Sequence, residues 1–76
     1  MNVKAYMLLE TEVGMADEVV EEVRRVDGVK SADPVTGPYD VVANVEVATI
    51  DDIATVIKNI HSAAGITKTT TLIKLK

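Results

Sequence analysis

The stretch Gly37-Pro38-Tyr39-Asp40, followed by the run VVANVEV at 41–47, decides the fold. Glycine permits positive φ and proline fixes φ near −65°, so the pair predicts a chain reversal between two extended segments. Apolar and polar residues alternate after the turn, which is typical of a strand with one buried face. A capped hairpin turn explains the pattern. It needs neither the phenol of Tyr39 nor the carboxylate of Asp40, so a small-molecule site in this loop is the other interpretation.

Two βαβ-like halves lie on either side of this turn. Hydrophobic periodicity predicts six elements: strands at 3–11, 29–36, 40–47 and 66–75, and helices at 15–26 and 50–64. The order βαββαβ is that of the α+β ferredoxin-like fold, a four-stranded antiparallel sheet with two helices on one face. Pro34 cannot donate a ladder hydrogen bond, so the second strand belongs at a sheet edge. Gly28 and Gly65 both end a helix before a strand, which predicts equivalent junctions.

Each predicted helix carries one apolar stripe, with residues recurring at spacings of three and four. The stripes consist of Met15, Val19, Val23 and Val26 in the first helix, and of Ile50, Ile53, Ile57, Ile60 and Ala64 in the second. Thr49 is a suitable N-cap for the second helix, and Asp51 and Asp52 fit its first turn, where negative charge is favourable.

The sheet face that the helices leave uncovered is partly apolar. If Val3, Met7 and Leu9 pack against the helices, the alternate residues of the sheet point the other way. The apolar members of that second face are Tyr6, Leu8, Val42 and Leu72. Two small subunits can bury this face against each other, so the sequence predicts a homodimer through these four residues.

Composition excludes several classes of protein. The chain has 76 residues, no cysteine and a formal net charge of −4, so disulfides, thiolate metal sites and direct nucleic-acid binding are not expected. No apolar stretch approaches the ~20 residues of a membrane span, and the N-terminus shows no secretory signal. We expect one cytoplasmic domain, 1–76, without a membrane partner. Its core must be aliphatic, since there is no Phe or Trp.

Candidate chemistry is sparse. His61 is the single histidine and has no carboxylate three or four residues away, so a solvated or capping role fits better than a metal site. No nucleophile–base pair and no phosphate-binding glycine loop is present, so no catalytic residue, metal or cofactor is predicted. An RNA-recognition module would carry aromatic residues on its central strands, and a metallochaperone of this fold would carry paired cysteines.

The run Thr67-Lys68-Thr69-Thr70-Thr71 in the last strand reflects β-propensity in the simplest interpretation. Together with the Gly37–Asp40 loop, it also supplies hydroxyls, backbone donors and a carboxylate. That set suits a zwitterion such as an α-amino acid, whose carboxylate needs donors and whose ammonium needs acceptors.

The whole chain resembles the effector-binding domain of the Lrp/AsnC regulators, also called the RAM domain. That family shows a Gly-x-Tyr-Asp turn between its second and third strands, which here is Gly37-Pro38-Tyr39-Asp40. Its last strand commonly reads Gly-Val-x-Arg-Thr-x-Thr-x-Ile-Val-Leu, and residues 65–75 here read GITKTTTLIKL. Lys68 stands in place of the usual arginine.

The resemblance implies a dimeric α+β barrel, assembly of dimers into an octamer (a tetramer of dimers), and an amino-acid effector between dimers. By similarity, the ligand contacts are Gly37, Pro38, Tyr39 and Asp40 from one subunit, and Thr69 and Thr71 from a neighbour. Full regulators carry a helix-turn-helix domain before this one. Since nothing precedes the first strand here, we expect a stand-alone sensor that binds no operator DNA itself and co-assembles with full-length Lrp/AsnC regulators or acts on another partner.

Two alternatives share this element order. A small dimeric α+β barrel enzyme, such as a monooxygenase or isomerase, also pairs open sheets, but it needs a histidine, aromatic residues or a cofactor within the barrel, where this chain offers little beyond Tyr6 and Asn44. An ACT-like regulatory module binds the same class of ligand. Ring assembly separates the leading interpretation from it, because ACT domains typically pair side by side.

Overall fold

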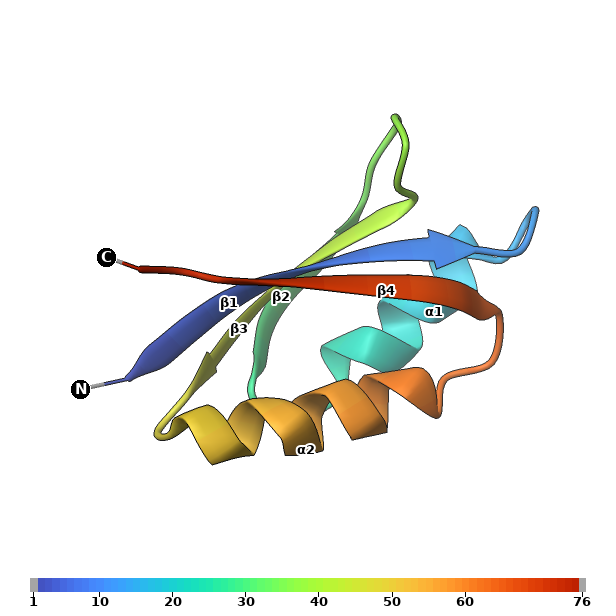
Figure 1. Ribbon diagram of the computed structural model, residues 1–76. Helices are drawn as coiled ribbons and strands as arrows, with labels where there is room; N and C mark the ends of the chain where they lie inside the picture. Colours follow the sequence, from blue (N-terminus) through green and yellow to red (C-terminus); the bar gives the residue numbers. More distant parts are fainter. Residues whose placement is uncertain (1, 76) are drawn as a thin grey trace.

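The sheet has four antiparallel strands in the order β2-β3-β1-β4, and both helices cover one of its faces, as the computed structural model shows (Figure 1). The structure describes residues 2–75. Its elements are β1 (Val3–Thr11), α1 (Ala16–Arg24), β2 (Val29–Pro34), β3 (Val41–Val47), α2 (Ile50–His61) and β4 (Ile66–Ile73). The predicted ferredoxin-like α+β fold is confirmed, and β2, which ends at Pro34, lies at an edge as expected.

Strand β1 runs through the centre of the sheet and separates its two faces. Its residues Ala5, Met7 and Leu9 are buried, while Tyr6 between them is 40% exposed. The neighbouring strand repeats the pattern, because Val41 and Ala43 pair with Leu9 and Met7 and are fully buried. The alternation predicted from the sequence therefore separates a core face, packed on the helices, from an open face.

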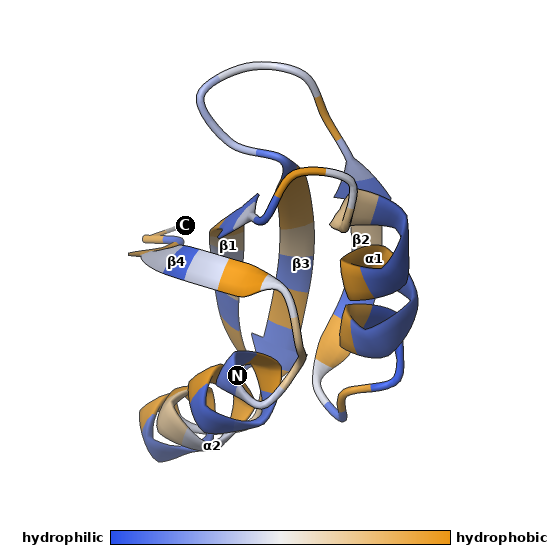
Figure 2. Cartoon of the chain, turned by 90° about the vertical axis from the view of Figure 1, so that its right-hand side faces the viewer, coloured by the Kyte–Doolittle hydropathy of each residue, from blue (hydrophilic) through white to orange (hydrophobic). Residues whose placement is uncertain are grey.

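Both helices are amphipathic, and the hydropathy colouring of Figure 2 shows apolar and polar residues alternating along them. The buried residues are Val19, Val20 and Val23 in α1, and Ile53, Val56 and Ile60 in α2. The predicted second stripe was wrong at both ends, since Ala64 lies beyond α2 and is exposed. Ile50 is 58% exposed, because it opens the helix beyond the edge of the core, and Val56 occupies the buried position instead.

The N-terminus of α2 is stabilised by a capping box. Thr49 Oγ1 accepts a hydrogen bond from the Asp52 backbone N–H at 3.3 Å, and Asp52 Oδ2 accepts one from the Thr49 N–H at 3.2 Å. The N–H of the N-cap residue Thr49 and the N–H of Asp52 in the first turn, which has no partner within the helix, both gain an acceptor in this way. The predicted N-cap is confirmed, and the carboxylate of Asp52 has a structural explanation.

Five predicted elements extend too far. Helix α1 is shorter than 15–26 at both ends, and β3 begins at Val41 instead of residue 40. Helix α2 ends at His61, β2 stops at Pro34 and β4 stops at Ile73. Helix ends fray in 3₁₀-like turns. At the end of α1 the Arg25 N–H donates to the Glu22 carbonyl and the Val26 N–H donates to the Val23 carbonyl, both at 3.1 Å. Beyond Pro34, the Val35 N–H donates to the Asp40 carbonyl at 2.9 Å, which closes the base of the Gly37–Asp40 turn.

The two helix-to-strand junctions have the same backbone geometry. Gly28 has φ +94° and Gly65 has φ +93°, a region that other residues rarely adopt. Their surroundings differ. A Cβ on Gly28 would lie 2.9 Å from branched side-chain carbons of Val47 and Val56, whereas a Cβ on Gly65 would meet the flexible side chain of Met15.

This difference predicts unequal costs for alanine at glycines of similar φ. Gly14→Ala, at φ +80° in open space, should lower the free energy of unfolding by about 1 kcal/mol through backbone strain alone. Gly28→Ala adds overpacking against two valines and should cost about 3 kcal/mol. Urea unfolding at one fixed protein concentration measures both. Equal losses for the two variants would show that the close approach at Gly28 has no energetic consequence.

Candidate functional site

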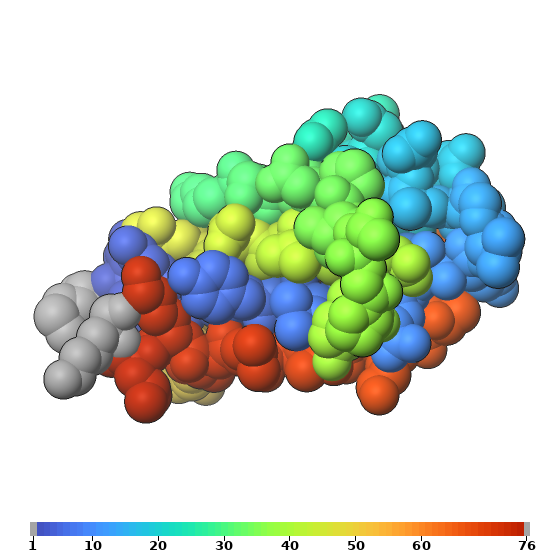
Figure 3. Space-filling view, turned by 90° about the horizontal axis from the view of Figure 1, so that it is seen from above, coloured from blue at the N-terminus to red at the C-terminus, as the bar shows by residue number. Residues whose placement is uncertain are grey.

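The Gly37–Asp40 loop stands above the open face of the sheet, on the side opposite the helices (Figure 1). Viewed from above, it lies over β1 near the C-terminal end of that strand (Figure 3). Backbone hydrogen bonds hold its base. The Val35 N–H donates to the Asp40 carbonyl at 2.9 Å, and the Asp40 N–H donates to the Leu9 carbonyl at 2.9 Å. The loop is thus fixed to the central strand at its base, and its tip is exposed.

Asp40 has a structural function in this arrangement. Its Oδ2 accepts a hydrogen bond of 2.8 Å from the backbone N–H of Thr11, the last residue of β1. A carboxylate that accepts from a partly buried amide forms a charge-assisted bond, which is stronger than a neutral one. The sequence pattern missed this contact, because Thr11 and Asp40 lie 29 positions apart. The second carboxylate oxygen of Asp40 is left for other partners.

The other predicted loop residues line the tip. Gly37 and Pro38 are exposed, and Tyr39 is half-buried. Gly37 has φ +153°, outside the range that a side chain readily allows, so the turn depends on glycine at this position. The loop therefore presents a tyrosine ring and exposed backbone on a firmly held base.

Thr69 and Thr71 lie elsewhere. The register pairs them with Leu9 and Met7, so their side chains point to the helix-covered side of the sheet. Thr69 Oγ1 lies 2.6 Å from His61 Nε2, at the end of α2. A hollow of about 320 Å³ opens at this edge, lined by His61, Ile66, Thr67, Lys68 and Thr69. His61 is exposed, as the sequence predicted, but its contact with Thr69 was not foreseen.

The loop and the two threonines do not come together within one chain. The loop rises above the open face, whereas Thr69 and Thr71 turn toward the helices at the β4 edge (Figure 1). Any site that uses both groups needs a second subunit. Their assignment as ligand contacts stays a prediction.

The open face brings the four predicted interface residues together. Tyr6 pairs with Leu72 across β1 and β4, and Leu8 pairs with Val42 across β1 and β3. Tyr6 is 40% and Leu72 48% exposed, which is high for apolar residues in a sheet. Figure 3 looks onto this face, where the four strands lie side by side and the loop crosses one end.

Charged residues occupy the other end of the open face. Lys4 and Glu46 pair across β1 and β3, and Lys30 and Lys74 border the same hollow of about 190 Å³. The pKa of the Glu46 carboxyl is lowered, chiefly by a hydrogen bond from Asn2 Nδ2 at 2.6 Å and also by the charges of Lys4 and Lys30. Glu46 is therefore ionised at neutral pH.

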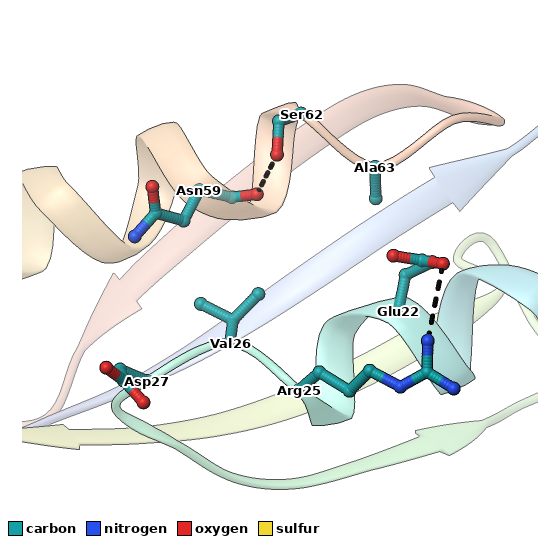
Figure 4. Close-up of a pocket in the computed structure, with 7 residues that line it drawn as sticks. All are labelled: Glu22, Arg25, Val26, Asp27, Asn59, Ser62 and Ala63. Carbon is teal, nitrogen blue, oxygen red and sulfur yellow. Dashed lines mark hydrogen bonds and ion pairs between the residues drawn. The ribbon is translucent and has the colours of Figure 1, made fainter.

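A further hollow of about 370 Å³ lies between the C-terminal ends of the two helices (Figure 4). Two interactions join residues of this hollow. Arg25 Nη1 lies 3.7 Å from Glu22 Oε1, and Ser62 Oγ donates to the Asn59 carbonyl at 2.6 Å. The Asp27 carboxylate and the side-chain amide of Asn59 also line the hollow.

Two kinds of polar feature are missing from residues 2–75. This part of the chain contains no group of three or more histidine, aspartate or glutamate side chains placed to hold a metal ion. It also contains no buried polar or charged residue. Neither helix, within the same residues, has the length and apolarity needed to cross a membrane.

The sequence comparison decides the family. The sequence model of the Lrp/AsnC ligand binding domain matches residues 4–76. The chain belongs to the Lrp/AsnC family. No curated protein matches this Lrp/AsnC domain in its sequence.

Solved structures agree with this assignment. A protein from Thermus thermophilus superposes with a TM-score of 0.91 at 27% identity, and the match covers 97% of this Lrp/AsnC domain and 94% of that protein. A protein from Pyrococcus horikoshii superposes with a TM-score of 0.88 at 33% identity, and the match covers 97% of this domain and 90% of that protein. E. coli AsnC gives 0.88 at 25% identity, with 97% of this domain but only 51% of AsnC covered.

The bond between Asp40 and Thr11 predicts that the site's stability depends on the carboxylate. Asp40→Ala should lower the free energy of unfolding by about 2 kcal/mol, because the partly buried Thr11 N–H loses a charged acceptor. Asp40→Asn keeps an oxygen acceptor and should cost about half as much. Asp51→Ala, in the exposed first turn of α2, is the matched control. A loss for Asp40→Ala no larger than that of the control would contradict this role.

Proposed function

We propose that this chain is a non-enzymatic regulatory domain that binds an amino acid, oligomerises, and modulates transcription or amino-acid metabolism in the cytoplasm. The observation that supports it most is the Gly-Pro-Tyr-Asp turn. Its base is anchored to β1 through Asp40, and its half-buried Tyr39 stands above the open face. Binding groups on a preorganised loop lose little conformational entropy when a ligand arrives. Membership of a family of ligand binding domains supports the same interpretation.

The proposed dimer pairs two open faces. Tyr6, Leu8, Val42 and Leu72 form its apolar part, and a second copy of this face is the partner of matching chemistry. Exposed apolar side chains that adjoin in space mark interaction surfaces more reliably than single exposed ones. A chain of 76 residues also gains stability from such burial, since small domains bury a limited fraction of their surface.

The proposed effector site lies between dimers of an octamer, with Gly37, Pro38, Tyr39 and Asp40 from one subunit and Thr69 and Thr71 from another. The opposite placement of loop and threonines supports a site shared by two subunits. A ligand that bridges dimers stabilises the bridged assembly by RT ln(1 + [L]/Kd) per site, so the amino-acid concentration controls the assembly. Full-length Lrp/AsnC regulators are the proposed partners through the same surfaces.

Amino-acid binding has a direct test. At a concentration 100 times its Kd, a bound amino acid adds about 2.7 kcal/mol of stability, which should raise Tm by roughly 15 °C for a domain of this size. Thermal shift with each of the twenty amino acids, followed by calorimetry, measures this. Tyr39→Ala should weaken binding about tenfold, and Val13→Ala, in an exposed turn away from the loop, should not. No shift with any amino acid would refute the proposal.

Dimerisation through the open face is tested separately. Leu72→Asp places a charge within the apolar part of the proposed contact and should convert the dimer into a monomer at micromolar concentration. Val13→Asp makes the same kind of change at a fully exposed position off this face and should leave the dimer intact. Sedimentation velocity distinguishes the two species. A wild-type monomer at that concentration would exclude this interface.

A further inference from the structure

The two edges of the sheet differ in how their backbone is protected. At β2, Arg24 Nε donates to the carbonyl of Ala32 at 2.9 Å, and Pro34 has no N–H to offer. At β4, no group among residues 2–75 bonds to the outward-facing backbone. A free edge is a template for a further partner, which proteins usually block. The β4 edge is therefore the one available for binding.

The hydrogen-bond pattern shows which β4 groups face outward. The Lys74 N–H donates to the Lys4 carbonyl at 2.8 Å. Because bonded and non-bonded pairs alternate in an antiparallel ladder, Leu72 and Thr70 bond to β1, whereas Thr69 and Thr71 do not. The N–H and C=O of Thr69 consequently point to the open edge, beside its own hydroxyl.

The hydrogen bond with His61 decides whether the Thr69 hydroxyl can donate its proton to a further group. In the contact of 2.6 Å between Nε2 and Oγ1, either the ring or the hydroxyl supplies the hydrogen. A neutral imidazole has one donor nitrogen and one acceptor nitrogen, and an imidazolium has two donors. When Nε2 donates, the hydroxyl oxygen accepts, and its own proton is free for another acceptor. Thr69 then offers two donors, O–H and N–H, at the edge.

We propose that His61 is a positioning residue for the carboxylate of a bound amino acid: its Nε2–H fixes the Thr69 hydroxyl, so that the O–H and N–H of Thr69 both donate to that carboxylate. The neighbouring backbone carbonyls of the edge accept from the ammonium group. The hollow of about 320 Å³ beside Thr69 has room for these groups. This inference rests on the proposed amino-acid-binding function and assigns one end of the ligand to β4.

The arrangement makes binding depend on pH. An imidazolium donates from both of its ring nitrogens, and the chain has a single histidine. The charged groups near it are Lys68 in the same hollow, Glu10, which lies 3.8 Å from Lys68 Nζ, and Lys58 one turn earlier on α2. Protonation of His61 enforces the donating form, so binding should tighten as pH falls.

Calorimetry on the full chain at pH 5.5 and pH 8.0 tests the inference, with the twenty L-amino acids and their primary amides as probes. The wild type should bind its best amino acid about fivefold more tightly at pH 5.5, and the matching amide, which lacks the carboxylate charge, about tenfold more weakly. His61→Leu should lose about tenfold in affinity together with the pH dependence. His61→Gln keeps an N–H donor without titrating, so it should retain the affinity but not the pH dependence.

Thr69→Val removes the hydroxyl, so it should lose affinity and pH dependence to the same extent as His61→Leu. Thr70→Val, the next residue on the opposite face, is its control and should bind like the wild type. His61→Leu with wild-type affinity and pH dependence would overturn the inference while amino-acid binding stands. Absence of binding by the wild type to every probe would instead refute the proposed function, and this inference with it.

Discussion

The register of β1 between β3 and β4 is the constraint on which the rest of this structure depends. It places Met7 and Leu9 in the core together with Val41 and Ala43. The same register sets Tyr6 beside Leu72 on the open face and turns Thr69 toward His61. A slip of one residue would exchange the two faces, because side chains alternate with period two. The register of β1 with its two neighbours therefore decides which residues form the core, the open face and the β4 edge.

Asp40 reinforces this register at the end of β1. Its N–H and its carboxylate bond to Leu9 and Thr11, which are alternate residues of the central strand. The loop that carries the family motif is thus bonded to the strand that organises the core. Asp40 therefore has a structural function through Oδ2, whereas a contact with a ligand is the proposed function of the same side chain.

Much of the fold was predictable because it follows local periodicity. Alternation identified the strands, Pro34 identified an edge, and Thr49 identified the start of α2. Element ends were less predictable, since fraying and the limits of the core decide them, as the exposure of Ile50 shows. The candidate site was predictable only in part. The contacts of Asp40 with Thr11 and of His61 with Thr69 depend on how β1, β4 and α2 are placed, and neither contact leaves a pattern in the sequence.

An aliphatic core has a spectroscopic consequence. The chain has no tryptophan and only two tyrosines, and neither tyrosine belongs to the buried core. Tyr6 lies on the open face and Tyr39 in the raised loop. All near-ultraviolet absorption and intrinsic fluorescence of the protein therefore arise from the two surfaces where association is proposed. The phenol rings report on those surfaces without a label, and exchanging one for leucine leaves the other as the sole aromatic chromophore.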